Sequence, residues 1–506
     1  MDLALNKTPM EGYVCPLDTV IYQEETQENI VPDACPDILS VVSTEAQAQL
    51  TRKESQEGKV ELSGCARVTV LYLPDGEDGP RCLELSVPFR CAASAPGITA
   101  GCPVSAVPRI TGAETRALNP RKVLVRLELA VSVQCWSPMD DDLCAPWDQP
   151  EYALQQRTEE LESYVVVAMA EKGFAFTDEV RLTASHPGIQ SLLGHRLELR
   201  CAEAKVIGSK LIFKGEAVLQ VRYRTQENTM ANGRWELPFS QIMELSCAPE
   251  DGTCSMDVVE RSSEVTLTGD EEGRTIAVHL ELLAQAVVRQ TRQVKLFTDA
   301  YSVTHQVTAE RRAYTLTQLW EESTAQEVAR ETLETPSAAR TVEDCFVALG
   351  QPQIERDGAE GVMSVQGKVT VLFTGEDGLL ACVTAPVSVQ CRIGLPEGGS
   401  CRVRCSLAGE VQAVATASGV EVRLPIQFSY LTTLSRQREA VVALAVEERE
   451  PEEERPSVIL RLAQPGECLW DIAKAYSTTT DDILAANELP EPEQLEGCLL
   501  LIPRSR

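Results

Sequence analysis

A threefold internal repeat is the feature that most constrains the fold of this chain. Similar segments surround Gly64, Gly215 and Gly367, which lie 151 and 152 residues apart in a sequence of 506 residues. In each copy, apolar residues at alternate positions end in an aromatic residue: Val68, Val70 and Tyr72; Leu219, Val221 and Tyr223; Val369, Val371 and Phe373. Such alternation is typical of β-strands. Because self-similarity at a fixed period indicates repeated structural units, we expect three copies of one β-rich module.

The similarity between the copies continues on both sides of these strands. The segment CPDILSVV matches HPGIQSLL 151 residues later, and the Pro-Phe pair at 88–89 matches the pair at 238–239. Long alternating segments at 123–133, 276–282 and 420–428 have one apolar and one polar face, which favours antiparallel sheets. Gly- and Asp-rich turns after Tyr72 and Phe373 predict hairpins. The residues therefore predict a mainly β fold with three tandem antiparallel β-rich modules, at 10–150, 151–300 and 301–446.

The charge of the chain excludes two classes of partner. It has 46 Lys and Arg against 76 Asp and Glu, a formal net charge of −30. Phosphate backbones and anionic membrane surfaces repel such a chain, so we expect neither nucleic acid nor a membrane as a partner. No apolar run approaches the roughly 20 residues of a membrane span. The first residues lack the pattern of a secretory signal, so the expected location is cytoplasmic.

The 18 cysteines are expected to stay reduced in the cytoplasm. They form no CxxC pair and the four histidines are isolated, so no metal site is predicted. Six of the cysteines follow the repeat: Cys82, Cys91 and Cys102 match Cys382, Cys391 and Cys401. Cys82 and Cys91 are nine residues apart and would face opposite sides of one strand. Buried or half-buried thiols are the expectation.

The repeat region shows no pattern of catalysis. It contains no Walker loop, GxSxG, HExxH or GxGxxG motif. Acidic pairs at 140–142 and 159–160 lie in polar segments and indicate solvated charge. His186 and His195 flank a segment that reads as a short helix or a turn, and His279 falls on the polar face of a strand. We expect no enzymatic activity and no cofactor.

The C-terminal sixty residues follow a different pattern. Six glutamates, two arginines and a proline at 447–455 predict an extended acidic linker over 447–456. A strand at Val458–Leu462 and a Pro-Gly turn at 465–466 then precede a helix. The apolar face of that helix comprises Leu469, Ile472, Ala473 and Tyr476.

A second helix is predicted after Thr479. Asp482 follows three residues later, as in a capping box, and Asn487 suits a left-handed stop at the end of the helix. Residues 499–502 read as a closing strand. Residues 457–506 are therefore predicted to form a small α+β unit of βααβ order.

This unit closely resembles the LysM domain, through PGECLWDIAKAY, DDILAANEL and LEGCLLLIP. LysM domains generally bind N-acetylglucosamine polymers, and the resemblance implies a groove formed by Gly466, Glu467, Cys468, Leu469, Asn487 and Leu489. Cys468 stands where the family has a capping threonine, and Cys498 where it has a glutamine. These two cysteines either form a disulfide across the groove or remain two thiols, which their Cα separation decides. Trp470 is either a half-buried core residue or an anchor for a partner.

Three such modules followed by LysM resemble the SipL-type spore coat morphogenesis proteins, whose repeated module is the SipL/SPOCS domain. The resemblance implies synthesis in the mother cell and residence at the forespore surface. It also implies a non-enzymatic assembly protein whose LysM domain docks onto the morphogenetic ATPase of the coat basement layer. The alternative is a peptidoglycan-binding protein anchored through LysM. A cell-wall hydrolase is a third reading, disfavoured by the missing catalytic motifs.

Overall fold

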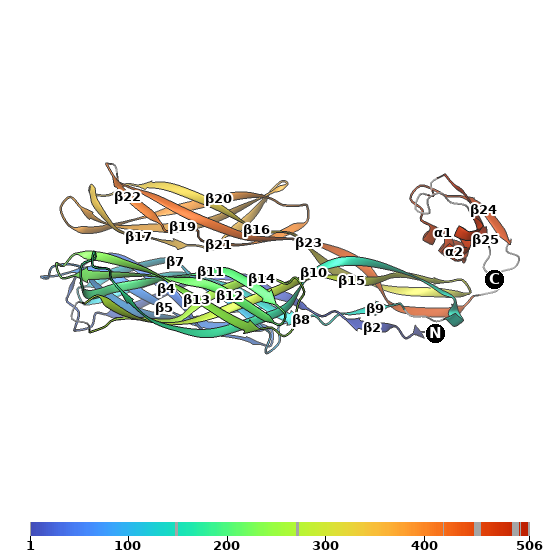
Figure 1. Ribbon diagram of the computed structural model, residues 1–506, viewed down its shortest axis with the longest axis horizontal. Helices are drawn as coiled ribbons and strands as arrows, with labels where there is room; N and C mark the ends of the chain where they lie inside the picture. The colour runs from blue at the N-terminus through green and yellow to red at the C-terminus, as the bar shows by residue number, and fades with distance from the viewer. Residues whose placement is uncertain are drawn as a thin grey trace.

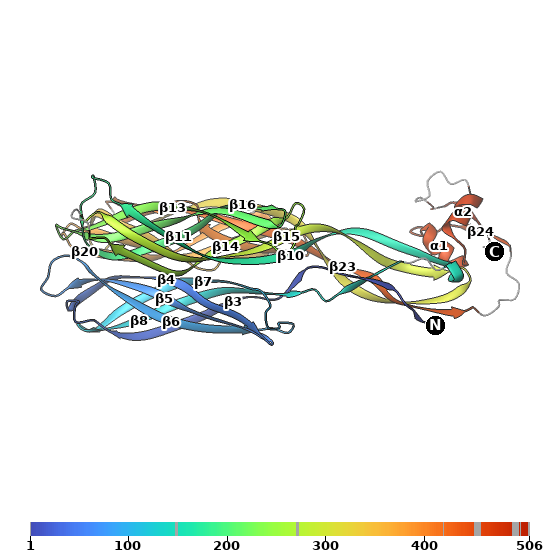
Figure 2. The same ribbon diagram turned by 60° about the horizontal axis from the view of Figure 1, so that its bottom comes forward.

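The computed structural model describes residues 2–146, 150–269, 273–417, 419–449, 457–487, 495 and 497–503. The fold is mainly β, as predicted, and its sheets are antiparallel. Figures 1 and 2 show an elongated molecule with three parts. Three β-rich bodies lie side by side, long strands extend from them as a narrow stalk, and the small C-terminal unit sits at the far end of that stalk.

Each of the three bodies is a sandwich of two sheets. In module one the sheets have the orders β4-β5-β6 and β3-β8-β7. The strands are β3 (Tyr13–Ile30), β4 (Ile38–Gln56), β5 (Lys59–Pro74), β6 (Arg81–Ser94), β7 (Val104–Asn119) and β8 (Lys122–Pro138). A core of alternating residues from both sheets, including Val70, Tyr72, Val125 and Leu127, fills the space between them. The alternation that predicted the strands thus supplies the buried face.

The other two modules follow the same plan. Module two pairs β11-β12-β13 with β14-β15-β10, and Tyr13 of β3 pairs with Val166 of β10 to join two sheets into one of six strands. Its strands are β10 (Leu154–Arg181), β11 (Ile189–Ile207), β12 (Lys210–Thr225), β13 (Met230–Glu244), β14 (Thr253–Leu267) and β15 (Thr275–Ser302). Module three contains β16 (His305–Leu333), β17 (Ala339–Leu349), β18 (Gln353–Asp357), β19 (Glu360–Gly375), β20 (Leu380–Gly394), β21 (Gly399–Leu407), β22 (Gln412–Thr416) and β23 (Gly419–Glu448).

The strand registers repeat in detail and correct the alignment of the three copies. Tyr72, Tyr223 and Phe373 each pair with a residue that is followed by a one-residue bulge. Counted from these aromatics, Val365 rather than Gly367 occupies the position of Gly64 and Gly215. In the first two copies the glycine faces a phenylalanine, whereas Val365 faces Val389. The spacing of the glycines therefore misaligned the third copy by two residues.

The predicted hairpins and long strands are confirmed. β5–β6 and β19–β20 are antiparallel hairpins, and the long alternating segments lie in β8, β15 and β23. Cys82 and Cys91 share β6 but face opposite sides, since Cys91 packs on the core of module one and Cys82 on a separate apolar cluster. Of the short helix or turn predicted around His186, the structure has a turn at 184–186, and from Ile189 the segment belongs to β11, in which His195 is buried.

The stalk is built from the ends of four long strands. Residues 154–166 of β10 pair with 289–302 of β15, and residues 305–319 of β16 pair with 433–448 of β23. Phe297, Leu296, Val441 and Leu444 are buried between these hairpins. β1 (Asp2–Leu3), β2 (Asn6–Pro9) and β9 (Asp142–Ala145) add short pairings, β1 with β23 and β2 with β9. Glu447 and Glu448 belong to β23, where they pair with β16; residues 450–456 of the predicted linker lie outside the described residues.

The C-terminal unit has the predicted βααβ order. It comprises β24 (Val458–Leu462), α1 (Leu469–Tyr476), α2 (Thr480–Ala486) and β25 (Leu499–Pro503), with β24 antiparallel to β25. The cap of α2 is confirmed, because the Thr479 side chain accepts a hydrogen bond of 2.9 Å from the Asp482 amide. The left-handed stop was assigned to the wrong residue. Asn487 is extended, with φ −129°, and Ser477 after α1 takes the left-handed conformation, with φ 54°.

Candidate functional site

The turn before α1 contributes the first predicted groove residues. Gly466 has φ +81° and open space around it. The Glu467 carboxylate accepts a hydrogen bond of 2.9 Å from the Gln464 amide and pairs with Arg461. The Arg461 guanidinium lies 5.3 Å from the centre of the Tyr476 ring. The Glu467 side chain therefore stabilises the turn before α1 and, through Arg461, connects it to Tyr476 at the end of α1.

The two cysteines of the predicted groove are not joined by a disulfide. Cys468 is the N-cap of α1 and makes no capping hydrogen bond, as expected for a thiol in that place. Its Sγ instead donates to Asp471 Oδ2 at 3.0 Å. The Cys498 carbonyl accepts from the Ala463 amide at 3.0 Å, which ties the closing strand to the turn before α1.

Asn487 links α2 to the closing strand. Its Nδ2 donates to the Leu501 carbonyl at 2.6 Å and the Ile483 carbonyl at 2.7 Å, while its Oδ1 accepts from the Leu501 amide at 2.8 Å. These bonds occupy the side-chain amide with structural partners. Leu489, the last predicted groove residue, lies outside the described residues.

The remaining two predicted residues, Leu469 and Trp470, pack against the small core of the unit. Trp470 also reaches across to the tip of the stalk. Its indole Nε1 donates to Asp299 Oδ2 at 2.8 Å, and its ring meets the Tyr301 ring edge to face, with centroids 4.8 Å apart. The side chain is thus half-buried in the core and also occupied by a contact from β15.

Asp299 is contacted by cationic and hydrogen-bond-donating side chains from both the C-terminal unit and the stalk. Lys474 Nζ lies 2.7 Å from Asp299 Oδ2, and Arg311 of β16 lies 2.6 Å from Oδ1. Burial by itself raises the pKa of Asp299, but the hydrogen bonds from Lys474 and Trp470 and the charges of Lys474 and Arg311 hold it below its ordinary value. The buried Tyr301 hydroxyl donates to the Thr478 carbonyl at 2.9 Å. We call Asp299 and Tyr301, with Trp470, Lys474 and Thr478, the dock.

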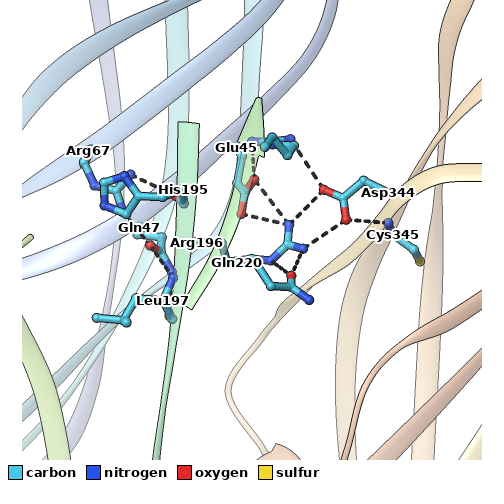
Figure 3. Close-up of polar contacts among 10 residues, drawn as sticks. Glu45, Gln47, Arg67, His195, Arg196, Leu197, Gln220, Asp344 and Cys345 are labelled. Atoms are coloured by element: carbon cyan, nitrogen blue, oxygen red, sulfur yellow. Dashed lines mark hydrogen bonds and ion pairs between the residues drawn. The ribbon is translucent and has the colours of Figure 1, made fainter. Parts of the chain in front are cut away.

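A second polar cluster joins the three modules. Counted from the aromatics at 72, 223 and 373, Glu45, Arg196 and Phe346 occupy the same position in the three copies. They meet at one point, where Arg196 Nη1 lies 3.3 Å from Glu45 and the guanidinium carbon 5.0 Å from the centre of the Phe346 ring. Asp344 completes the cluster, 3.1 Å from Arg196 Nη2 (Figure 3). We call this cluster, with Arg222 paired to Glu45 at 2.6 Å, the junction.

The charged side chains of the junction are largely buried. The side chains of Glu45 and Asp344 are 8% and 9% exposed. Burial opposes the charge on both Arg196 and Asp344, but their mutual attraction prevails, raising the pKa of Arg196 and lowering that of Asp344. Nearby, Arg67 donates to the carbonyl of His195 at 3.0 Å, and burial lowers the pKa of His195 to about 3 (Figure 3). His195 is therefore a neutral structural residue.

No group of three or more His, Cys, Asp or Glu side chains that could hold a metal ion occurs among the described residues. None of the helices in the described ranges is long and apolar enough to cross a membrane.

The sequence did not point to Asp299, Tyr301 or the junction. Asp299 and Trp470 are 171 residues apart, and Arg196 is 151 residues from Glu45. Asp299 lies in a strand with no motif around it. An acidic residue near the end of a strand was the only feature of the sequence that could have drawn attention to it. The junction had a signal in principle, because the repeat places Glu45 and Arg196 in register.

Comparison with known protein families gives two matches. The family model described as SipL, SPOCS domain matches residues 37–117, which cover β4 to β6 and most of β7. The model of the LysM domain matches residues 463–496. A search of curated proteins finds no match, and neither does a search of solved structures.

The chain therefore contains a SPOCS domain followed by a C-terminal LysM domain, as the sequence resemblance predicted. Both are binding or structural domains, and neither match indicates an enzyme family. Together they indicate a sporulation-related protein that carries a module of the glycan-binding type.

Proposed function

We propose that this chain is a non-enzymatic assembly protein of the spore envelope. Made in the mother cell, it docks through its LysM domain onto the morphogenetic ATPase of the coat basement layer at the forespore surface. The three modules at 10–150, 151–300 and 301–446 form its body, and residues 457–506 form its binding head. The SPOCS and LysM matches support this assignment.

An exposed apolar face on the LysM domain is the observation that carries the proposal. Val458, Leu460 and Leu462 alternate along β24 and are 48%, 65% and 60% exposed. Leu499, which pairs with Leu462 on β25, is 63% exposed. Clustered exposed aliphatic side chains mark protein–protein surfaces, whereas sugar hydroxyls require polar groups. This sheet face therefore suits a protein partner.

The predicted groove is a second observation that favours a protein partner over a glycan. Glu467 and Asn487, its polar side chains, are occupied by hydrogen bonds within the domain. Cys468 supplies a thiol in place of the hydroxyl that the LysM family carries there. Fewer side-chain hydrogen-bonding groups thus remain in the predicted groove for a glycan.

The body gives the head a rigid base. The three modules, each built around a core, meet at the buried junction, and the stalk extends from modules two and three. A rigid body that also contacts the coat layer would raise the effective concentration of the head at its partner. Modest head affinity would then suffice for recruitment.

Peptidoglycan binding through LysM remains the second candidate, favoured by the LysM match at 463–496. A paired assay on the full chain separates the two. Binding to the purified ATPase and co-sedimentation with insoluble peptidoglycan are measured for the wild type and for Leu460→Glu. Leu39→Glu is the matched control, because Leu39 is also 65% exposed but lies in module one.

The proposal predicts at least a tenfold loss of ATPase binding for Leu460→Glu and none for Leu39→Glu. It is overturned if the wild type sediments with peptidoglycan but does not bind the ATPase.

A further inference from the structure

We propose that the stalk tip is an internal latch that holds the LysM domain by Trp470 and competes with the external partner for that side chain. The inference deepens the proposed function and rests on it only for the identity of the partner. The contact lies at the far end of the molecule, where α1 approaches the ends of β15 and β16 (Figure 1).

The latch is a specific contact rather than a chance approach. Trp470 and Lys474 are four residues apart and therefore lie on one face of α1. Both reach the same carboxylate of Asp299, at 2.8 Å and 2.7 Å. Tyr301 adds an edge-to-face ring contact with Trp470 and a hydrogen bond to Thr478, beyond the end of the helix. Two strand residues thus recognise both the side chains and the backbone of the α1 region.

The contact is also built to open. Ile472, Ala473, Ile483, Leu500 and Ile502 form a core within the LysM domain itself, each at most 2% exposed. Lys474 is 40% exposed in its pair with Asp299, and solvent weakens such ion pairs. Because α1, α2 and β25 also contact one another, these contacts remain when the domain leaves the tip, whereas the side of the core that Tyr301 covers becomes exposed.

The latch divides the surface of the LysM domain in two. The apolar face of β24 and β25 stays exposed while the domain is docked, whereas Trp470 is half-buried and held by Asp299 and Tyr301. A partner that needs both surfaces meets a reduced affinity, because its apparent dissociation constant equals the intrinsic constant divided by the undocked fraction of molecules. If about nine in ten molecules are docked, releasing the latch tightens binding about tenfold.

The test uses the full chain with two independent changes on the stalk side. Asp299→Asn removes the charge that Lys474 contacts, and Tyr301→Phe removes only the hydroxyl bonded to Thr478. Glu160→Gln is the matched control, because Glu160 is a paired carboxylate on the same hairpin, 3.7 Å from Lys295. Amide hydrogen exchange of segments 297–303 and 469–478 reports the latch without any partner. Affinity for the purified ATPase reports competition.

The latch predicts faster exchange in both segments for Asp299→Asn and Tyr301→Phe, with Glu160→Gln like the wild type. It predicts that the same two variants bind the ATPase more tightly, while Trp470→Glu exchanges faster but binds less. Unchanged exchange in both stalk variants overturns the latch. Faster exchange with equal or weaker binding overturns the competition. If exchange rises but no form of the chain binds the ATPase, the latch stands and the proposed function fails.

Discussion

At the scale of single residues, Arg196 bears the most on the arrangement of the body. It lies between the carboxylates of Glu45 and Asp344 and stacks on Phe346, so it contacts both neighbouring modules at once. A buried ion pair adds little net stability over apolar packing, but removing one partner leaves the other charge buried and uncompensated. The junction therefore specifies how the modules fit together.

Arg196→Ala should destabilise the body by about 3 kcal/mol, the lower end of the range for a broken buried pair, because Glu45 and Asp344 lose one of their two cations and keep Arg222. The measurement is the midpoint of chemical denaturation followed by circular dichroism. Arg126→Ala, which removes an exposed pair with Glu24 at 2.7 Å, should leave the midpoint nearly unchanged. Equal shifts for the two variants would show that the junction carries no special weight.

Gly215 illustrates a close approach at residue scale. A Cβ atom there would lie 2.2 Å from the Arg200 carbonyl oxygen and 2.6 Å from the Phe239 ring. Gly215→Ala should therefore cost about 1–3 kcal/mol through forced shifts in module two. Gly394→Ala is the control, since nothing lies within 4 Å of a Cβ atom built on that strand glycine. A neutral Gly215→Ala in the same denaturation assay contradicts the packing argument.

At the scale of elements, the patterns that depend on neighbours in sequence were predictable. The alternating strands, their hairpins and the βααβ unit follow from periodicity and turn residues, and all appear in the structure. The errors arose where tertiary contacts decide the conformation. Asn487 is extended because its side chain bonds to β25. Gly367 was aligned with the glycines of the first two copies, but the bulges set the strand register and place it two residues further along. Which polar residues meet at the latch and junction depends on packing between distant strands, which periodicity does not encode.

The two short helices of the LysM domain differ in their caps. Thr479 caps α2 with its hydroxyl, whereas Cys468 leaves α1 without a side-chain cap. Cys468→Thr should stabilise α1 by about 1 kcal/mol, and Thr479→Ala should destabilise α2 by a similar amount. Hydrogen exchange of the amides at 469–476 and 480–486 measures both. Faster exchange of α1 in Cys468→Thr would mean that the thiol bond to Asp471 outweighs a cap.

At the scale of the whole molecule, the latch determines whether the LysM domain is held or released, and pH tests its chemistry. The pKa of Asp299 is depressed in the folded state, so its contribution is fully present above the unfolded value of about 3.9 and is lost as pH falls through the lower folded value. Burial raises the pKa of Tyr301 to about 12, so its hydroxyl stays protonated throughout this range.

The latch should therefore be insensitive to pH between 5 and 8 and begin to open only as pH falls below about 4. The fluorescence difference between the wild type and Trp470→Phe, followed from pH 3 to 7, reports the environment of the indole. Asp299→Asn should remove the acid transition. A midpoint near neutrality would assign the transition to another group.

The distribution of charged residues over the molecule bears on its large negative net charge. The chain carries −30 overall, and four of its cations lie at contacts between its parts: Arg196 and Arg222 at the junction, and Lys474 and Arg311 beside Asp299. The excess acid is left for solvated surface, which keeps an elongated body from associating nonspecifically.

The proposed recruitment to the forespore surface by the coat ATPase can be observed by imaging. The full chain, fused to a fluorescent protein, is followed in sporulating cells with and without the ATPase. We expect a ring of fluorescence around the forespore that becomes diffuse when the ATPase is absent, and that is also diffuse for Leu460→Glu at normal protein levels. A ring that persists without the ATPase would contradict this recruitment.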